Sequence, residues 1–299
     1  MKPMLLMAGP ERVFQGLAAA RGLTRPAPRV IAVTSGKGGV GKSNIVVNLG
    51  LALARQGLKV LLIDADLGLA NLDILLGLTA RYTIYEVLSH QKSLAEAVLA
   101  GPEGVKILSA SSGISDLAEL DEFQKIFLLN ELDNYAENLD VVLIDTGAGI
   151  SRNVLFFNLA SLERIVVANN QPTSITDAYA MIKVLATRHG ERHFNLLVNG
   201  LTRTREAESV YRTLLTVVER FLGSEIQLGY LGCIPYDEAI PRAVMRRQPV
   251  LTLYPHSPAS QSFTRLAQRL WETPPRGEMA GNIKFFWRRR CGHPRCAAR

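Results

Sequence analysis

The feature that most constrains this chain is a glycine-rich loop between a predicted strand and a predicted helix. The apolar run Val30–Thr34 leads into the segment SGKGGVGKS at residues 35–43, and a stretch of helical period follows over 42–56. Gly36 and Gly41-Lys42-Ser43 have the spacing G-x-x-x-x-G-K-[ST], which is typical of phosphate-binding loops. Glycines let backbone N–H groups converge on phosphate oxygens at the positive end of a helix dipole. A chance glycine-rich loop is the alternative, and the strand–loop–helix context argues against it.

The residue types in this loop predict individual roles toward a nucleotide. Lys42 is expected to neutralise the β- and γ-phosphates, and the Ser43 hydroxyl to ligate Mg²⁺. Lys37 lies inside the loop and therefore beside the phosphates, which favours a catalytic or dimer-bridging role over a merely exposed charge. The predicted phosphate-binding residues are Gly36, Lys37, Gly38, Gly39, Val40, Gly41, Lys42, Ser43 and Asn44.

Two later apolar runs end in aspartates. Asp64 and Asp66 follow the run 59–63, and Asp145 follows Val141–Ile144. In a parallel sheet these strand ends meet at the edge where the phosphate loop lies. A buried carboxylate needs a cation or a donor, so Asp145, with Asp64 in support, is expected to bind Mg²⁺ through water. Asp66 is expected to orient the attacking water. The alternative for Asp64 and Asp66 is that each only caps the next helix.

Strands and helices alternate along the chain, which predicts an α/β fold. The strands are continuous apolar runs, as expected when helices cover both faces of a doubly wound, mostly parallel sheet. The predicted strands are Val30–Thr34, Lys59–Ile63, Val105–Leu108, Val141–Ile144, Ile165–Ala168, Asn195–Val198 and Gln227–Tyr230. The predicted helices are Lys42–Gln56, Asp116–Asn138, Ile175–Thr187, Ala207–Leu222 and Ser260–Trp271. We predict a basic N-terminal arm and linker (1–29), a nucleotide-binding domain (30–272) and a basic, aromatic tail (273–299).

Composition narrows the possible locations. The 299 residues are 47% hydrophobic and 20% charged, which is typical of a globular protein. No apolar run reaches the roughly 20 residues that cross a bilayer, and the apolar residues Met4–Met7 are too few for a signal peptide. Three cysteines provide no disulfide framework, which fits a reducing compartment. We expect a cytoplasmic protein.

The net charge of +7 comes from the two ends of the chain. Residues 1–29 carry +4 and residues 272–299 carry +5, whereas residues 30–271 carry −2. DNA is therefore an unexpected partner for the domain, and the ends are expected to meet something anionic or to be merely solvated.

The tail has the pattern of an interfacial amphipathic helix. On a helix, Ile283, Phe286 and Trp287 share one face, Lys284 and Arg288 share another, and Phe285 lies between them. This arrangement favours binding to an anionic membrane surface, and the alternative is a helix docked on the domain itself. The predicted membrane residues are Ile283, Phe285, Phe286, Trp287 and Arg288.

The loop with two lysines, Lys37–Ser43, resembles the deviant Walker A motif of the MinD/ParA family of dimerising ATPases. Three further segments resemble the flagellar branch of that family, the FlhG/FleN flagellar-number regulators. They are DADLGLANLD at 64–73, IDTGAGIS at 144–151, and IPYDE at 234–238 followed by YPHS at 254–257. The resemblance spans about residues 30–271.

This resemblance implies a slow, Mg²⁺-dependent ATPase that acts as a dimerisation switch controlling flagellar number or placement. Lys37 would reach the phosphates of the partner in an ATP-sandwiched homodimer, and Asp66 and Asp145 would be catalytic. Asn199 would recognise the base, and Pro235 would begin the loop that covers adenine. The ATP state would lie peripherally at the inner face of the cell membrane. The implied protein partners are the GTPase FlhF, a flagellar transcription activator or flagellar switch proteins. The N-terminal arm would stimulate FlhF, and the equal alternative is that this arm packs on the domain.

Three other functions are alternatives on the same fold. The first is a division-site ATPase of the MinD type, and only the flagellar-type motifs argue against it. A ParA-type DNA- or cargo-partition ATPase would have a basic domain, whereas residues 30–271 are net acidic. A metal-cluster carrier needs paired cysteines at a dimer interface, and Cys233 stands alone in this region.

Overall fold

The computed structural model describes residues 27–67, 70–110, 119–135 and 138–275. Within them, one eight-stranded sheet has the order β3-β4-β2-β5-β1-β6-β7-β8. All neighbours are parallel except β3 and β4, so the predicted fold class is confirmed. The strands are β1 (Arg29–Ser35), β2 (Val60–Ala65), β3 (Leu99–Ala100), β4 (Lys106–Leu108), β5 (Val141–Ala148), β6 (Glu163–Ala168), β7 (His193–Leu201) and β8 (Gln227–Pro235).

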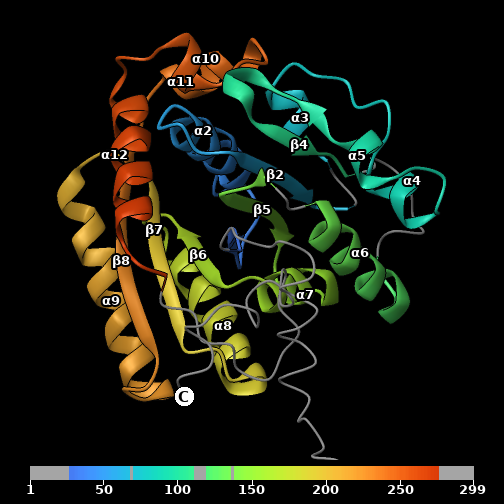
Figure 1. Ribbon diagram of the computed structural model, residues 1–299. Coiled ribbons are helices and arrows are strands. Elements are labelled where there is room, and N and C mark those ends of the chain that lie inside the picture. The colour runs from blue at the N-terminus through green and yellow to red at the C-terminus, as the bar shows by residue number, and fades with distance from the viewer. Residues whose placement is uncertain (1–26, 68–69, 111–118, 136–137, 276–299) are drawn as a thin grey trace, which may run out of the picture.

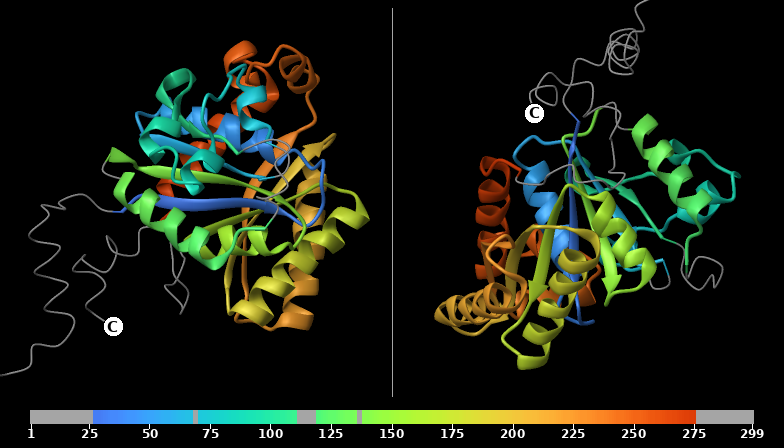
Figure 2. Two further views of the ribbon diagram at one scale, coloured as in Figure 1. Left: turned by 90° about the vertical axis from the view of Figure 1, so that its right-hand side faces the viewer. Right: turned by 90° about the horizontal axis from the view of Figure 1, so that it is seen from below.

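Helices cover both faces of this sheet (Figures 1 and 2). The α-helices are α2 (Lys42–Ala54), α3 (Leu72–Leu75), α4 (Ile84–Leu88), α5 (Leu94–Ala97), α6 (Glu122–Tyr135), α7 (Arg152–Ala160), α8 (Pro172–His189), α9 (Thr204–Leu222), α10 (Ala239–Met245), α11 (Val250–Leu253) and α12 (Pro258–Glu272). One 3₁₀ turn, η1, spans Pro102–Gly104. The helices α2 and α12 pack side by side on one face, and α4 to α9 lie on the other.

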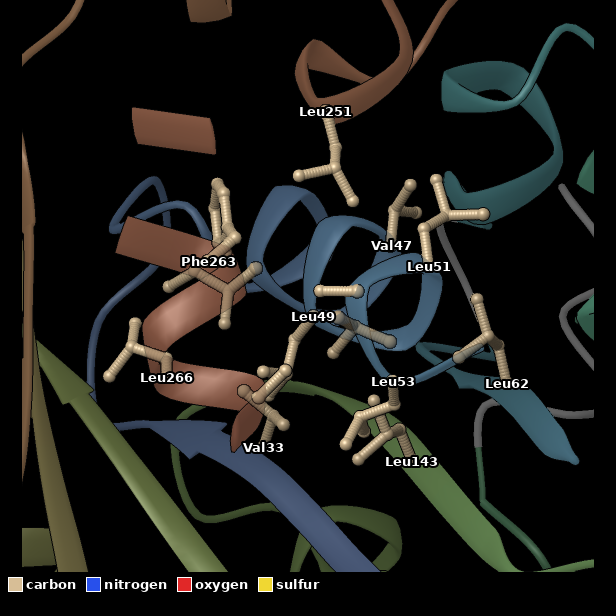
Figure 3. Packing of buried hydrophobic residues seen from close by; sticks show 14 of the residues in the cluster. Val33, Val47, Leu49, Leu51, Leu53, Leu62, Leu143, Leu251, Phe263 and Leu266 are labelled. Carbon is tan, nitrogen blue, oxygen red and sulfur yellow. The ribbon is translucent and has the colours of Figure 1, made fainter. Parts of the chain in front are cut away.

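The core follows from the alternation of side chains along each strand. Leu62 and Leu143 point toward α2, and Figure 3 shows Leu143 below Leu53 of α2 and Leu62 to the right of Leu53. Their sequence neighbours on β2 and β5 point to the opposite face and pack under α4, α5, α6 and α7. Because both faces are covered, each strand is apolar along its whole length, which is the pattern seen in the sequence.

All five predicted helices overlap observed ones but have different bounds, and for two of them the structure gives the cause. The segment predicted as a helix over 116–138 forms α6, which begins only at Glu122. Asp121 and Gln124 there exchange side-chain-to-backbone hydrogen bonds, and this arrangement caps the helix. The helix predicted to reach Gln56 ends at Ala54, because Gly57 turns the chain with φ of 85°. Each of the seven predicted strands overlaps an observed one, and the short antiparallel β3 was not predicted.

The two ends of the described chain meet at the edge opposite the phosphate loop. Arg29, at the start of β1, donates hydrogen bonds to the carbonyls of Leu270 and Thr273 at the end of α12. Its guanidinium also binds the Glu163 carboxylate at 2.7 Å. The start of β1 and the end of α12 therefore lie next to each other.

Candidate nucleotide site

The phosphate loop lies between β1 and α2, at the carboxyl edge of the sheet. Gly39 and Gly41 have φ of 75° and 93°, a left-handed backbone that favours glycine. Gly41 immediately precedes α2, so the backbone N–H groups of the loop lie at the N-terminus of this helix. This geometry confirms the strand–loop–helix context on which the phosphate-binding prediction rests.

Lys42 is held inside the loop. Its Nζ donates to Ser35 Oγ at 3.0 Å, and Ser35 Oγ donates to the Lys37 carbonyl at 2.7 Å. Burial lowers the pKa of Lys42, and the carboxylates of Asp145 and Asp66 oppose this shift. The ammonium group is thus placed between the loop and two carboxylates, where a phosphate would be its strongest partner.

Asp145 lies inside β5 rather than just beyond it, since the strand runs on to Ala148. Across the sheet it is paired with Asp64 on β2 and Val33 on β1. Burial raises the pKa of Asp145 to about 7, the charge of Asp64 adds to this, and a hydrogen bond with Ser43 opposes it. Its Oδ1 is buried and has no hydrogen-bond partner among the described residues.

These groups fit a hydrated Mg²⁺. The ion prefers oxygen ligands and keeps several of its waters, and Ser43 Oγ and the unpartnered Asp145 Oδ1 are a hydroxyl and a carboxylate oxygen side by side. Ser43 would hold the ion directly, and Asp145 would hold its water shell. When bound there, Mg²⁺ neutralises charge on the β- and γ-phosphates.

The raised pKa of Asp145 predicts a pH-dependent stability for the nucleotide-free protein. A carboxyl with a pKa above its ordinary value is protonated in the folded state, so its contribution is complete below about pH 4 and lost as the pH rises through about 7. Between pH 5 and 8 the free energy of unfolding should fall on the order of 2 kcal/mol more for the wild type than for Asp145→Asn. Urea unfolding in EDTA at each pH measures this, and equal slopes for the two proteins would contradict it.

Asp64 supports the segment that follows β2. Its Oδ2 accepts the N–H groups of Asn71 and Leu72 at 2.8 and 3.1 Å, and its Oδ1 accepts that of Asp66 at 3.1 Å. Burial nevertheless raises the pKa of Asp64 to about 6. The capping alternative is thus seen in the structure, because Leu72 opens α3. A role of Asp64 toward Mg²⁺ stays a prediction.

Asp66 is half-buried and lies beside the end of β5. A Cβ added at Gly147 would lie 3.5 Å from Asp66 Oδ1, an ordinary contact distance, so this carboxylate lies next to Gly147. Asp66 is also near enough to Lys42 to affect its pKa. The structure therefore brings Asp66, Lys42 and Asp145 together, as expected for residues at the carboxyl ends of neighbouring parallel strands.

The second lysine of the loop has partners that the sequence reasoning missed. Lys37 Nζ donates to Gln171 Oε1 at 3.0 Å and to Thr173 Oγ1 at 3.1 Å, at the start of α8. The polar run 169–174 follows the apolar strand β6, so the rule that located the aspartates would also have located these two residues. Lys37 thereby joins the phosphate loop to α8.

Gly36 allows α8 to touch the loop. A Cβ at position 36 would clash with the backbone carbonyl of Asp177, whereas a Cβ at Gly38 would meet nothing closer than Ala148 Cβ at 3.9 Å. Gly36→Ala should lower the free energy of unfolding by about 1–3 kcal/mol. The matched control Gly38→Ala should change it by less than about 0.5 kcal/mol. Thermal or urea unfolding measures both, and equal losses would refute the contact with α8.

The two predicted base-binding residues lie on neighbouring strands. Asn199 is on β7 and Pro235 ends β8. Asn199 Nδ2 donates to the Val40 carbonyl at 2.7 Å, so in this structure the amide supports the phosphate loop. Recognition of the base by Asn199 and Pro235 stays a prediction, and so does the contact of Asn44, which lies in the first turn of α2. The tail residues Ile283, Phe285, Phe286, Trp287 and Arg288 lie outside the described residues.

Comparison with known proteins agrees with this geometry. The model of the CobQ/CobB/MinD/ParA nucleotide binding domain matches residues 31–250. The chain belongs to the MinD/ParA family. Within this MinD/ParA chain, no described helix is long and apolar enough to cross a bilayer.

Two curated relatives of this MinD/ParA chain cover most of its length. The chain is 43% identical to the antiactivator FleN of Pseudomonas aeruginosa, over 89% of this chain and 94% of FleN. It is 34% identical to the flagellum site-determining protein YlxH of Helicobacter pylori, over 80% of each chain. These likenesses confirm the resemblance to the FlhG/FleN branch.

A solved structure supports the fold and the type of ligand. The septum site-determining protein MinD of Pyrococcus horikoshii, complexed with Mg-ADP, matches with a TM-score of 0.66 and 26% identity. The match covers 82% of this chain and 96% of that one.

Proposed function

We propose that this chain is an ATP-hydrolysing dimerisation switch that controls the number and placement of flagella. The observation that carries the proposal is the 43% identity to FleN, which extends over 94% of that protein. The likeness to the Mg-ADP complex of MinD supports a purine nucleotide with Mg²⁺ as the ligand.

The residues at the site divide the work of hydrolysis. The backbone of the loop and Lys42 bind the phosphates and neutralise their charge. Ser43 and Asp145 bind Mg²⁺, directly and through water. Asp66, beside Lys42 and the end of β5, orients the attacking water. Asn199 and Pro235 lie at the same sheet edge, where an amide can pair with adenine.

Dimerisation would give Lys37 its catalytic role. In the monomer Lys37 is bound to Gln171 and Thr173. An ATP-bound partner offers its phosphates instead, and a cation supplied in trans stabilises the charge of the transition state. Hydrolysis then removes the γ-phosphate and with it the reason for the two chains to stay together.

Association with the membrane would use the basic tail in the ATP state. The tail follows α12, whose end lies at the sheet edge opposite the phosphate loop. Sedimentation with anionic vesicles in ATP, compared with ADP, tests this association. Equal sedimentation after deletion of residues 281–299 would refute it.

The partners of the proposed switch follow from its relatives. FleN is named an antiactivator, which supports a flagellar transcription activator as a partner here. FlhF and flagellar switch proteins are further proposed partners. A second candidate function is division-site selection, because one matching solved structure is a septum site-determining MinD. Partition of DNA is disfavoured by the net charge of −2 over residues 30–271.

A deletion strain separates the two candidate functions. Loss of the chain should change the number or placement of flagella while cell length and division stay normal, and expression of the wild type should restore the count. Expression of Asp66→Ala should not restore it, because the switch cannot reset. Electron microscopy of flagella and measurement of cell length in the same culture provide both readouts. Division defects with normal flagella would favour the MinD-type function.

A further inference from the structure

The outer edge of the sheet at β8 is open. Among the described residues, β8 pairs with β7 alone and is the last strand of the sheet. Figure 1 shows β8 beside α9 and α12. The Leu228 carbonyl accepts a hydrogen bond from Tyr211 Oη at 3.0 Å. An edge strand of this kind presents backbone donors and acceptors that another strand can use.

A cavity of about 620 Å³ lies along this edge. It is lined on one side by β8 between Tyr230 and Pro235, and on the other by α12. Gly232 lets α12 pack closely on β8, since a Cβ there would come within 2.7 Å of Leu266 Cδ2. The volume is in the range of sites that hold a ligand or a short peptide segment.

The wall formed by α12 is cationic. Gln261, Arg265 and Arg269 are four residues apart, so they form one column along the helix. Both arginines are exposed, and Arg265 donates to Ser262 Oγ at 3.0 Å. Within the described part of the chain, neither forms an ion pair with an acidic side chain.

These charges select the occupant of the cavity. The domain as a whole has a net charge of −2, whereas these two arginines without acidic partners make the surface at the groove locally positive. The two ends of this chain carry +4 and +5 and would be repelled by them. The occupant is therefore acidic and comes from another molecule.

We propose that the groove between β8 and α12 binds an extended acidic segment of a partner protein, which adds a strand to β8 and places carboxylates against Arg265 and Arg269. In such β-augmentation the backbone bonds give affinity and alternate side chains give specificity. Pro235 has no N–H and so marks the end of the usable edge. This site goes beyond the proposed function, because Pro235 is the only nucleotide-site residue that lines it.

A library of random dodecapeptides displayed on phage, selected on the full-length chain, tests the proposal without knowledge of the partner. The selected peptides should be rich in Asp and Glu, and an enriched peptide labelled with fluorescein should bind with measurable anisotropy. The double variant Arg265→Glu/Arg269→Glu should weaken binding at least about tenfold. The control Arg188→Glu/Arg205→Glu reverses two exposed arginines on α8 and α9 and should bind as the wild type does.

Two further measurements locate and define the contact. Bound peptide should slow alkylation of Cys233, which is half-buried in the groove, in a Cys291→Ser/Cys296→Ser background. A peptide with alternate amides N-methylated should lose binding, because it cannot form strand hydrogen bonds. Three outcomes would overturn the proposal. The selected peptides could show no enrichment in Asp and Glu, the peptide could bind the Arg265→Glu/Arg269→Glu variant as tightly as the wild type, or the N-methylated peptide could bind as tightly as the unmodified one. Preference for an oligonucleotide or for vesicles over the peptide would overturn it as well.

The test is independent of the nucleotide switch. The ATPase rate of the Arg265→Glu/Arg269→Glu variant should stay within about twofold of the wild type, which also shows that the variant is folded. Loss of peptide binding with normal hydrolysis then bears on the groove alone, and loss of hydrolysis in Asp66→Ala bears on the proposed function alone.

Discussion

Replacing Asp66 with alanine is expected to lower the rate of ATP hydrolysis by a factor of about 10² to 10⁴. The carboxylate lies near Gly147 and acts on the Lys42 pKa, which supports its proposed place beside the γ-phosphate. Phosphate binding is assigned to the loop backbone and to Lys42, which Ser35 Oγ holds, so ATP affinity should stay within about threefold. Steady-state release of phosphate and equilibrium binding of a fluorescent ATP analogue measure the two effects.

Asp73→Ala is the matched control. Asp73 belongs to the same segment after β2, and its carboxylate accepts the N–H of Ile74 at 2.8 Å. This substitution should change hydrolysis by less than about threefold. Unchanged hydrolysis in Asp66→Ala would assign the water to another group. A parallel loss of ATP affinity would show that Asp66 supports the fold of the loop rather than the reaction.

Most of this site could be predicted because it obeys one rule of parallel sheets. Residues that follow an apolar strand gather at one edge, and this rule places Lys42, Asp64, Asp66 and Asp145 together from the sequence alone. The ends of the strands are predicted less accurately, since the strand predicted over Val141–Ile144 includes Asp145 and runs on to Ala148. Strand ends depend on pairing with β1 and β2, and pairing is a tertiary property.

The contacts between loops could not be predicted in the same way. That Lys37 binds Gln171 and Thr173 depends on the docking of α8 on Gly36, which no local pattern encodes. Asn199 likewise contacts Val40 because β7 ends beside the phosphate loop. The start of α6 was predicted too early, although Asp121 and Gln124 have the spacing of a helix cap.

Lys37→Ala is expected to abolish ATP-dependent dimerisation and to lower hydrolysis by at least about 100-fold, as loss of a cation supplied in trans does. Light scattering of the purified protein with ADP and with ATP measures the dimer. The wild type should dimerise only in ATP, Asp66→Ala should hold that dimer longer, and Lys37→Ala should remain monomeric. An unchanged mass for the wild type in both nucleotides would refute the sandwich dimer.

Mixing the two inactive variants distinguishes action of Lys37 in trans from action in cis. In the structure Lys37 is bound to Gln171 and Thr173 of its own chain, so a role within one chain is the competing explanation. If Lys37 acts in trans, a mixed dimer of Lys37→Ala and Asp66→Ala has one intact site, made of Asp66 from the first chain and Lys37 from the second. Each mixed dimer has one working site of two, so mixing should raise hydrolysis well above that of either variant alone, to at most about half of the wild-type rate. If Lys37 acts in cis, each chain of the mixed dimer lacks one required residue at its own site, and mixing restores nothing.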